Sequence, residues 1–501
     1  MMTKKLISLL LALLLPAGAL LSCSENNSDE TPAAGSDPTA VSSEETPGET
    51  ETEIARANYP DSLPELDFGG ADVIVHSRGD DSPTEVVAEE MTGEAVNDAI
   101  YERNALVGQK LNVKVGVFIG EGWERYDTSV NAIRSSIMAS DGSFDIIAGW
   151  SARIPSLSLE GLFLNLNEMN YLDFDAMWWN QSVVSDLQVG GQLHFLTGDI
   201  ARSMLSAMYC YAFNQRVAED NQVEDLYAVV KEHRWTLDYV YDLTSKIYSD
   251  LNGDGNADDG DYFGLVTNGG NDADAYMQGG RVSMLSRDEE GYPVLDVDEE
   301  YLASLVEKVY ALLWENPGGH PTKDNNAWYT DYPAFVEDRA LFATAVMSGI
   351  IGTFADMESD YGLLPYPLYD ENQQSYGTRV QDAVSLWSIP IDAKNPDMSA
   401  AVMEALAAQS WRTVTPAYFD VALKHRYSRD VQTAEMVDLI KDNIYINFEC
   451  LYNESIGNPW FVMRNLMTNK NSNFASYWAS QRKIIGKQLE KAVDKIRALG
   501  N

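Results

Sequence analysis

The most specific chemical pattern in the sequence is a run of oxygen-bearing residues between positions 250 and 261. Oxygen ligands stand at positions 1, 3, 5, 7, 9 and 12 of this segment, with glycine at position 6; they are Asp250, Asn252, Asp254, Asn256 (through its backbone carbonyl), Asp258 and Asp261. This is the spacing of an EF-hand calcium loop, and Ca²⁺ prefers six to eight oxygen ligands. Because Asp261 replaces the usual glutamate, we expect weaker binding. The pattern predicts a structural Ca²⁺ site; a solvated acidic turn is the alternative.

Catalytic motifs are missing from the sequence. It has no HExxH zinc motif, no GxSxG elbow, no Walker loop and no GxGxxG fingerprint, and its five histidines include no pair spaced for a metal. A glycosidase needs only two carboxylates about 5 to 9 Å apart, and 77 acidic residues make sequence proximity uninformative. We expect a protein that is not an enzyme, with a secreted carbohydrate-active enzyme as the alternative.

The N-terminus carries an export signal. Two lysines precede an apolar run from Leu6 to Leu21, which is interrupted by proline and glycine and followed by Cys23. Leu20 to Cys23 has the form of a bacterial lipobox, in which the cysteine is acylated and becomes the first residue of the mature chain. We therefore predict a signal peptide over 1–22, a lipidated Cys23 with a disordered tether over 23–57, and anchoring to the outer face of the cell membrane.

The body after residue 57 is too long for one hydrophobic core, since single cores rarely exceed about 250 to 300 residues. We expect two lobes. A formal net charge of -42 excludes nucleic acid and anionic lipid surfaces as partners. Cys210 and Cys450 are the remaining cysteines, and either a disulfide or two free thiols is compatible with their positions.

Short apolar runs alternate with amphipathic segments in the first half of the body. Strands are predicted over 72–76, 113–118 and 144–148, and helices over about 96–110 and 126–138. This alternation indicates an α/β fold with a mainly parallel sheet flanked by helices. Ligands bind beyond the carboxyl ends of the strands in such sheets, where Arg78 and Trp150 follow the first and third strands.

Seven stretches, in order, resemble the maltodextrin-type family of extracellular solute-binding proteins of ABC transporters. They are 144–150 (FDIIAGW), 178–181 (WWNQ), 190–195 (GGQLHF), 198–200 (GDI), 235–238 (WTLD), 361–367 (YGLLPYP) and 389–396 (IPIDAKNP). Two of these stretches also predict helix starts from local chemistry alone. Asn395 is a good N-cap and Pro396 suits a first helical turn. Thr236 similarly caps the helix predicted over 236–249.

The resemblance implies a two-lobed periplasmic-binding-protein-like fold of class II type. Each lobe would be a mainly parallel sheet flanked by helices, and the discontinuous lobes would be joined by a hinge. We assign 58–201 and 368–425 to lobe 1, and 202–367 and 426–501 to lobe 2. It also implies a sugar site of aromatic rings and polar groups in the interlobe cleft. The ligand-binding candidates are Trp150, Asp199, Trp460, Trp387, Trp328 and Arg78.

Together these features predict the substrate-binding subunit of an ABC importer, which takes a sugar, and by the family default an oligosaccharide. Its partners would be the solute and the permease subunits in the membrane, and the body would be monomeric. A surface sensor or adhesin with the same fold shares this binding chemistry and stays open as an alternative.

Overall fold

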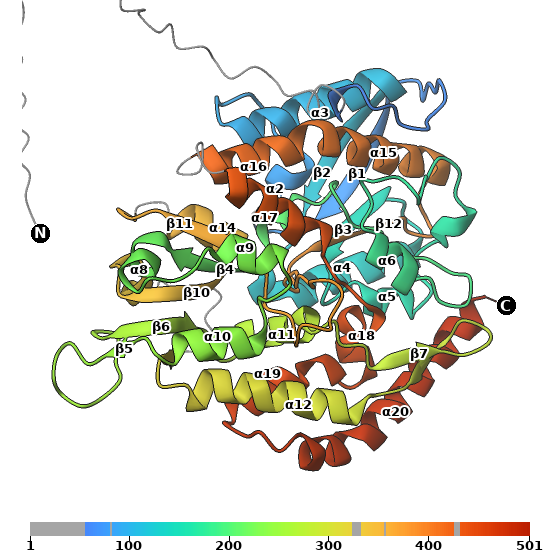
Figure 1. Ribbon diagram of the computed structural model, residues 1–501. Coiled ribbons are helices and arrows are strands. Elements are labelled where there is room, and N and C mark those ends of the chain that lie inside the picture. Colours follow the sequence, from blue (N-terminus) through green and yellow to red (C-terminus); the bar gives the residue numbers. More distant parts are fainter. Residues whose placement is uncertain (1–55, 81–82, 323–331, 355–356, 425–430, 501) are drawn as a thin grey trace, which may run out of the picture. The chain divides into compact units, whose positions relative to one another are not determined.

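The computed structural model describes residues 56–80, 83–322, 332–354, 357–424 and 431–500. These residues form two principal sheets, each flanked by helices (Figure 1). None of the helices in these ranges combines the length and apolar character needed to cross a bilayer.

The first sheet has the strand order β12-β3-β1-β2. It contains β1 (Ala71–Ser77), β2 (Val113–Ile119), β3 (Ile146–Trp150) and β12 (Ser385–Ser388). The strand β1 pairs in parallel with both β2 and β3, and α3 (Ala95–Leu111) and α4 (Tyr126–Ala139) connect them. The predicted β-α-β-α-β arrangement is therefore confirmed. Only β12, which enters from the far half of the chain, is antiparallel to its neighbour β3.

The helix α3 shows why these segments fold as predicted. The Glu94 side chain accepts hydrogen bonds from the backbone N–H groups of Val96 and Asn97 at its start, and Asn112 ends it in the left-handed conformation. Its buried face packs against α15 (Pro396–Gln409), as the upper part of Figure 1 shows. The N-cap of α15 is Asn395, as predicted, because its side chain accepts from the Met398 N–H.

The second sheet is mixed, although we expected it to be mainly parallel. Its order is β11-β4-β10-β6-β5, with β9 also paired to β6. Its strands are β4 (Tyr209–Asn214), β5 (Tyr248–Ser249), β6 (Tyr262–Thr267), β9 (Gly319–Pro321), β10 (Ala340–Val346) and β11 (Tyr361–Leu364). The strand by which the chain enters this sheet, β4, is antiparallel to both β10 and β11. Entering and returning strands run in opposite directions, which the local sequence pattern could not reveal.

Three segments of the chain lie side by side between the two sheets. Met208 forms a β-bridge with Val380, and Thr378 forms one with Ile444. The Gln381 N–H also donates to the Ala207 carbonyl at 3.1 Å. The first and second sheets are therefore joined by extended backbone near residues 207, 380 and 444.

Helices α12 (Glu299–Tyr310), α19 (Val462–Thr468) and α20 (Phe474–Leu499) pack together beside the second sheet (Figure 1). The remaining elements are short or peripheral. They are α2 (Pro83–Val86), α5 (Pro155–Ser158), α6 (Gln181–Asp186), α7 (Arg202–Ser206), α8 (Gln215–Asp220), α9 (Leu226–Lys231), α10 (Leu237–Thr244), α11 (Ala275–Gly279), β7 (Leu285–Arg287), β8 (Pro293–Leu295), α13 (Pro333–Val336), α14 (Met347–Gly352), α16 (Thr415–Lys424), α17 (Val431–Asp442) and α18 (Phe448–Leu451). Short helical turns complete the fold.

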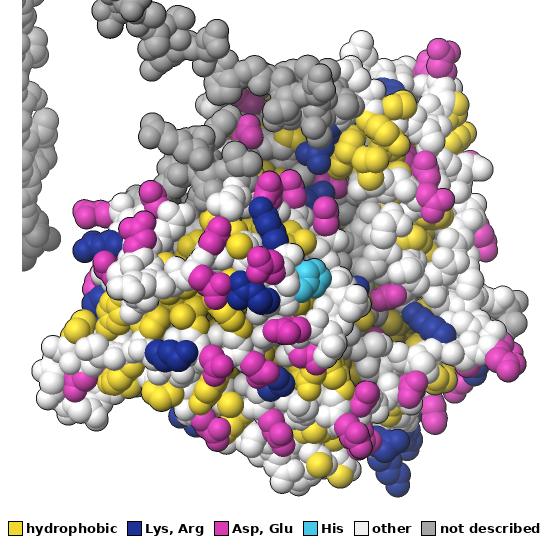
Figure 2. Space-filling view, in the orientation of Figure 1, with side chains coloured by type: hydrophobic (Ala, Val, Ile, Leu, Met, Phe, Trp, Pro, Cys, Tyr) yellow, Lys and Arg dark blue, Asp and Glu magenta, His cyan; other side chains and the backbone are white. Residues whose placement is uncertain are grey.

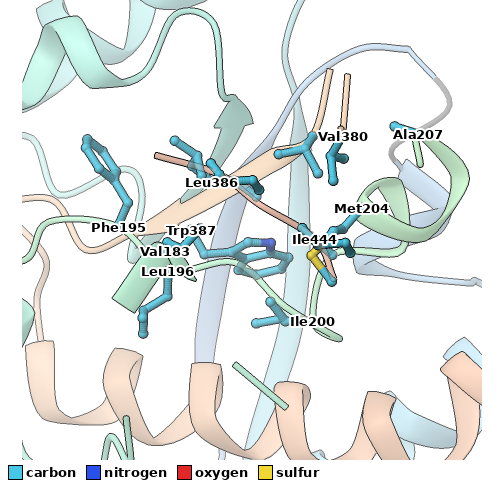
Figure 3. Packing of buried hydrophobic residues seen from close by; sticks show 14 of the residues in the cluster. Val183, Phe195, Leu196, Ile200, Met204, Ala207, Val380, Leu386, Trp387 and Ile444 are labelled. Carbon is cyan, nitrogen blue, oxygen red and sulfur yellow. The ribbon is translucent and has the colours of Figure 1, made fainter. Parts of the chain in front are cut away.

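Two large hydrophobic clusters form the core. One contains the first sheet together with one face of the second sheet (Cys210 and Ala212 of β4), and the other contains the opposite face of the second sheet (Tyr211 and Phe213). Trp387 belongs to the cluster of the first sheet, where its indole lies among Ile200, Leu196 and Val183 (Figure 3). On the surface, acidic side chains spread over the visible face and alternate with lysine and arginine (Figure 2). Cys210 and Cys450 are free thiols, so the structure contains no disulfide between them.

Candidate functional site

A cavity of about 200 Å³ lies where the loops after β2 and β3 meet the 378–384 segment and the C-terminal region. Its lining comprises Trp123, Ser151, Ala152, Arg153, Val380, Gln381, Asp382, Val384, Ile446, Cys450, Leu451, Asn453, Glu454, Phe461 and Arg464. This is the edge predicted for ligand binding, beyond the carboxyl ends of the parallel strands. The lining mixes aromatic, aliphatic and charged side chains.

An aromatic wall at this cavity is built on the Asp80 carboxylate. One oxygen of Asp80 accepts from the Trp123 backbone N–H at 3.0 Å, and the other accepts from the Trp150 indole N–H at 3.1 Å. The two tryptophan rings pack edge to face with centroids 6.1 Å apart. Trp123 is 42% exposed, whereas Trp150 is 2% exposed. The exposed ring is therefore Trp123, in η1 (Trp123–Arg125), and Trp150 supports it from behind.

Arg153 connects the aromatic wall to the C-terminal region. Its guanidinium carbon lies 3.9 Å from the ring centroid of Tyr126 and 5.2 Å from that of Trp123. The same side chain forms an ion pair with Glu454 of η6 (Asn453–Ile456), which packs on α20. A contact between the first sheet's loops and the C-terminal region thus crosses the cavity.

Four alternating charges form what we call the charged floor: Asp274, Arg379, Asp382 and Arg464. Arg379 lies 3.5 Å from Asp274 and 3.2 Å from Asp382, nitrogen to oxygen, and Arg464 pairs with Asp274 and lies 4.0 Å from Asp382. The side chains of Arg379 and Asp274 are fully buried. Burial raises the pKa of Asp274, and the guanidinium groups of Arg464 and Arg379 act against this rise. Asp382 and Arg464 face the cavity, and the other two lie behind them.

The predicted ligand-binding residues are not all gathered here. Trp460 is 1% exposed and lies behind the cavity wall: its backbone N–H donates to the Asn453 side chain at 2.8 Å, and its indole N–H to the Gln278 amide oxygen at 3.2 Å. Arg78 is also buried and is not part of the cavity lining. Trp328 lies outside the described residues.

Asp199 and Trp387 contact other parts of the fold and not the cavity. The Asp199 carboxylate accepts from the Thr415 hydroxyl at 2.5 Å and pairs with Lys441 at 3.4 Å, which ties the segment before α7 to α16 and α17. Trp387 is fully buried in the hydrophobic cluster that contains the first sheet (Figure 3). Burial is the usual place for a tryptophan side chain in a folded core. Neither Asp199 nor Trp387 belongs to the cavity lining.

The segment 250–261 joins β5 to β6. The preceding helix α10 ends at Thr244, earlier than the predicted Ser249, because Tyr248 and Ser249 pair with β6 instead. Side-chain oxygens close the loop: Asp250 accepts from the Gly253 and Gly255 N–H groups at 2.6 and 2.9 Å. In the part of the chain that the structure describes, no three His, Cys, Asp or Glu side chains gather as a metal site. Calcium binding therefore stays a prediction.

Sequence reasoning missed Trp123, Arg153, Asp382 and Arg464. Trp123 carries the same signal as Trp150, since it lies just after the carboxyl end of a predicted strand. The charged floor offers no such signal, because its members are separated by up to 190 residues. Their proximity follows only from the arrangement of the two sheets.

Comparison with known proteins supports the fold and leaves the ligand open. No protein-family model and no curated protein matches this sequence. Among solved structures, Mycobacterium tuberculosis UspC has a TM-score of 0.54 and 12% identity, covering 83% of this chain and 100% of its own. An ABC transporter solute-binding protein from Thermotoga lettingae, bound with α-D-tagatose, has a TM-score of 0.51 and 12% identity, covering 84% and 100%.

The GacH receptor of Streptomyces glaucescens, solved unliganded and with acarbose, is similar at a TM-score of 0.50 and 12% identity, covering 86% of this chain and 98% of its own. Together these similarities show that the chain has the two-lobed periplasmic-binding-protein-like fold. The α/β fold class expected from the sequence is therefore confirmed.

Proposed function

We propose that this chain is the substrate-binding subunit of an ABC importer and binds a carbohydrate in the cavity described above. The observation that carries the proposal is Trp123, an exposed ring held at the carboxyl ends of the parallel strands beside polar and charged groups. A sugar ring presents C–H groups on its face and hydroxyls at its edge. Sites for sugars therefore combine flat aromatic rings with carboxylates, amides and arginine.

In this proposal the sugar packs on Trp123, while Gln381, Asp382 and Asn453 bond its hydroxyls. Trp150 and Asp80 position the stacking ring. The segments near residues 207, 380 and 444 act as the hinge, and closure completes the binding shell. The Arg153 to Glu454 ion pair is a contact that closure would form.

We propose that lipid on Cys23 anchors the protein to the outer face of the cell membrane and that the tether lets a monomeric body meet the permease. Residues 1–55 of these segments lie outside the described residues. A sensor or adhesin would bind sugar in the same way, and a carbohydrate-active enzyme would also cleave it. Product analysis after incubation with a bound oligosaccharide distinguishes the enzyme from the other two.

A thermal-shift and calorimetric screen against mono- and oligosaccharides should identify a ligand. A sugar at 100 times its Kd adds about 2.7 kcal/mol to stability. Trp123→Ala should weaken its binding at least tenfold, about 1.4 kcal/mol, because the stacking surface is lost. The melting temperature of the ligand-free protein should change little, since the ring is half exposed.

Tyr101→Ala is the matched control for this variant. Tyr101 is 38% exposed on α3 and is not part of the cavity lining, so its removal should leave the affinity unchanged. Equal affinity of wild type and Trp123→Ala would contradict stacking in this cavity. A screen in which no carbohydrate binds would contradict the proposed function itself.

We also propose that the 250–261 loop binds Ca²⁺ as a structural ion. Its donors are the oxygens named above, and Gly253 and Gly255 give the backbone the positive φ angles (75° and 77°) that a tight loop needs. The ion would neutralise clustered carboxylates between β5 and β6. No catalytic step is assigned to it.

Calcium should raise the melting temperature, and EDTA should reverse this. Asp250→Asn with Asp254→Asn should abolish the shift, because two charged ligands are removed. Asp238→Asn, an exposed acidic residue on α10, is the control and should keep it. Equal calcium responses in wild type and the double variant, or no response in wild type, would reject the site.

A further inference from the structure

The charges that line the cavity narrow the class of ligand, given the proposed function of binding a carbohydrate there. The ionisable lining consists of two arginines and two acids, Arg153 with Glu454 and Arg464 with Asp382, beside the thiol of Cys450. Burial raises the pKa of that thiol, so it stays neutral. Each arginine already has a carboxylate partner. An anionic ligand needs an uncompensated cation, and a cationic ligand an uncompensated carboxylate. This lining therefore favours an uncharged ligand.

Asp382 and Arg464 are spaced so that one hydroxyl group fits between them. The Asp382 Oδ2 and Arg464 Nη2 atoms are 4.0 Å apart, which is too far for a direct hydrogen bond. One hydroxyl oxygen between them can lie within hydrogen-bond distance of both, donating to the carboxylate and accepting from the guanidinium. A hydroxyl has both capacities. A carboxylate or phosphate dianion cannot donate, and an ammonium group cannot accept, so the pair selects a hydroxyl group.

Two buried residues hold Asp382 and Arg464 in position. Asp382 Oδ1 accepts from Arg379 Nη2 at 3.2 Å, and Arg464 donates to Asp274. Arg379 and Asp274 are fully buried and also contact each other. They are positioning residues, which fix the spacing of the two groups that face the cavity.

The volume of the cavity limits the part of a ligand that it can enclose. Pockets for drug-sized ligands usually have about 300 to 1,000 Å³, and this cavity has about 200 Å³. One sugar ring or an open-chain polyol fits a cavity of this volume. A chain of three rings would extend beyond the cavity.

We infer that the site binds a single uncharged monosaccharide or polyol, one of whose hydroxyls bridges Asp382 and Arg464. This inference replaces the oligosaccharide expected from the sequence with a smaller class of ligand. It also assigns specificity to two residues on segments that the resemblance did not single out.

Calorimetry with the purified protein tests the ligand class. The panel contains neutral hexoses, pentoses and alditols, the matched uronic acids, amino sugars and 6-phosphates, and trisaccharides. We expect a neutral single-ring or open-chain ligand to bind best, with the charged analogue of the same sugar at least 100-fold weaker. A tighter trisaccharide, acid, phosphate or amino sugar overturns the inference but keeps the carbohydrate receptor. No binding by any sugar overturns the receptor as well.

A cycle of deoxy sugars and variants tests the bridge itself. Asp382→Asn and Arg464→Lys should each weaken the best ligand about 10- to 100-fold, because a hydrogen bond to a charged group is lost. The deoxy analogue lacking the bridging hydroxyl should bind weakly to wild type and lose no further affinity in either variant. Asp238→Asn, on the exposed pair with Lys308, should change nothing.

Folding is checked by the ligand-free melting temperature, and Arg464→Lys retains the charge beside Asp274. If every deoxy analogue loses the same factor in Asp382→Asn as in wild type, no hydroxyl bridges the pair and the inference is wrong.

Discussion

Replacing Glu404 with alanine should lower the free energy of unfolding by about 4 kcal/mol. Glu404 lies on α15 and is fully buried. Its carboxylate accepts from the indole N–H groups of Trp178 and Trp179, each at 3.0 Å, and from the Asp173 backbone N–H at 3.2 Å. Each buried donor left without an acceptor costs about 1 to 3 kcal/mol, and the removed side chain adds a cavity.

Urea unfolding of wild type and variant gives this difference directly. Glu307→Ala is the control, because Glu307 is exposed in the last turn of α12 and its loss should change stability by less than about 0.5 kcal/mol. A loss below about 1 kcal/mol in Glu404→Ala would mean that the indoles find other acceptors.

The same carboxyl group makes stability depend on pH. Burial raises the pKa of Glu404 to about 7 from the ordinary 4.5, although the hydrogen bonds from Trp179, Asp173 and Trp178 oppose this. The folded protein therefore holds this proton more tightly than the unfolded chain. The resulting stabilisation is complete below about pH 4.5 and is lost as pH rises through about 7, and it amounts to about 3 kcal/mol.

Glu404→Gln should remove this part of the pH dependence. Unfolding free energies at pH 5 and pH 8 should differ by about 2 to 3 kcal/mol less in the variant than in wild type. Some pH dependence should persist in the variant, since burial also raises the pKa of Glu449 to about 7. Identical pH profiles would contradict the assignment.

Local patterns predicted the parts of the fold that are set by local chemistry. The strands over 72–76 and 113–118 and the caps at Thr236 and Asn395 were found because alternation and capping depend on neighbours in sequence. The direction of β4 and β11 was not found, since pairing partners in the second sheet are far apart along the chain.

The candidate site was predicted in place but not in detail. A cavity lies at the edge where ligand binding was predicted, beyond the parallel strands, and the exposed ring there is Trp123 and not Trp150. Trp150 is the last residue of β3, where it pairs with β12 and is buried, whereas Trp123 lies in the loop after β2. The strand predicted over 144–148 ended too early to separate these two positions. Likewise, Glu404 joins Trp178 and Trp179 across more than 220 residues, a contact that no spacing rule contains.

Replacing Asp274 with alanine should destabilise the protein by about 3 to 5 kcal/mol. The side chain is fully buried between Arg379 and Arg464, and its removal leaves two guanidinium groups with Asp382 as their only partner within the charged floor. Breaking a buried ion pair from one side leaves an uncompensated charge in a medium of low dielectric constant. Asp238→Ala, from an exposed pair with Lys308, should cost about 1 kcal/mol or less.

Asp274→Leu combined with Arg379→Met should recover most of this loss, because apolar side chains of similar volume replace the buried pair and remove its desolvation penalty. If instead the two single losses add in the double variant, the two residues do not act as a unit. The rescued variant also separates stability from binding. Asp382 and Arg464 would still face the cavity in it, but without the buried pair that holds them 4.0 Å apart. A stable double variant that binds the preferred sugar at least tenfold more weakly would show that the buried pair acts on the ligand through the spacing of its two neighbours.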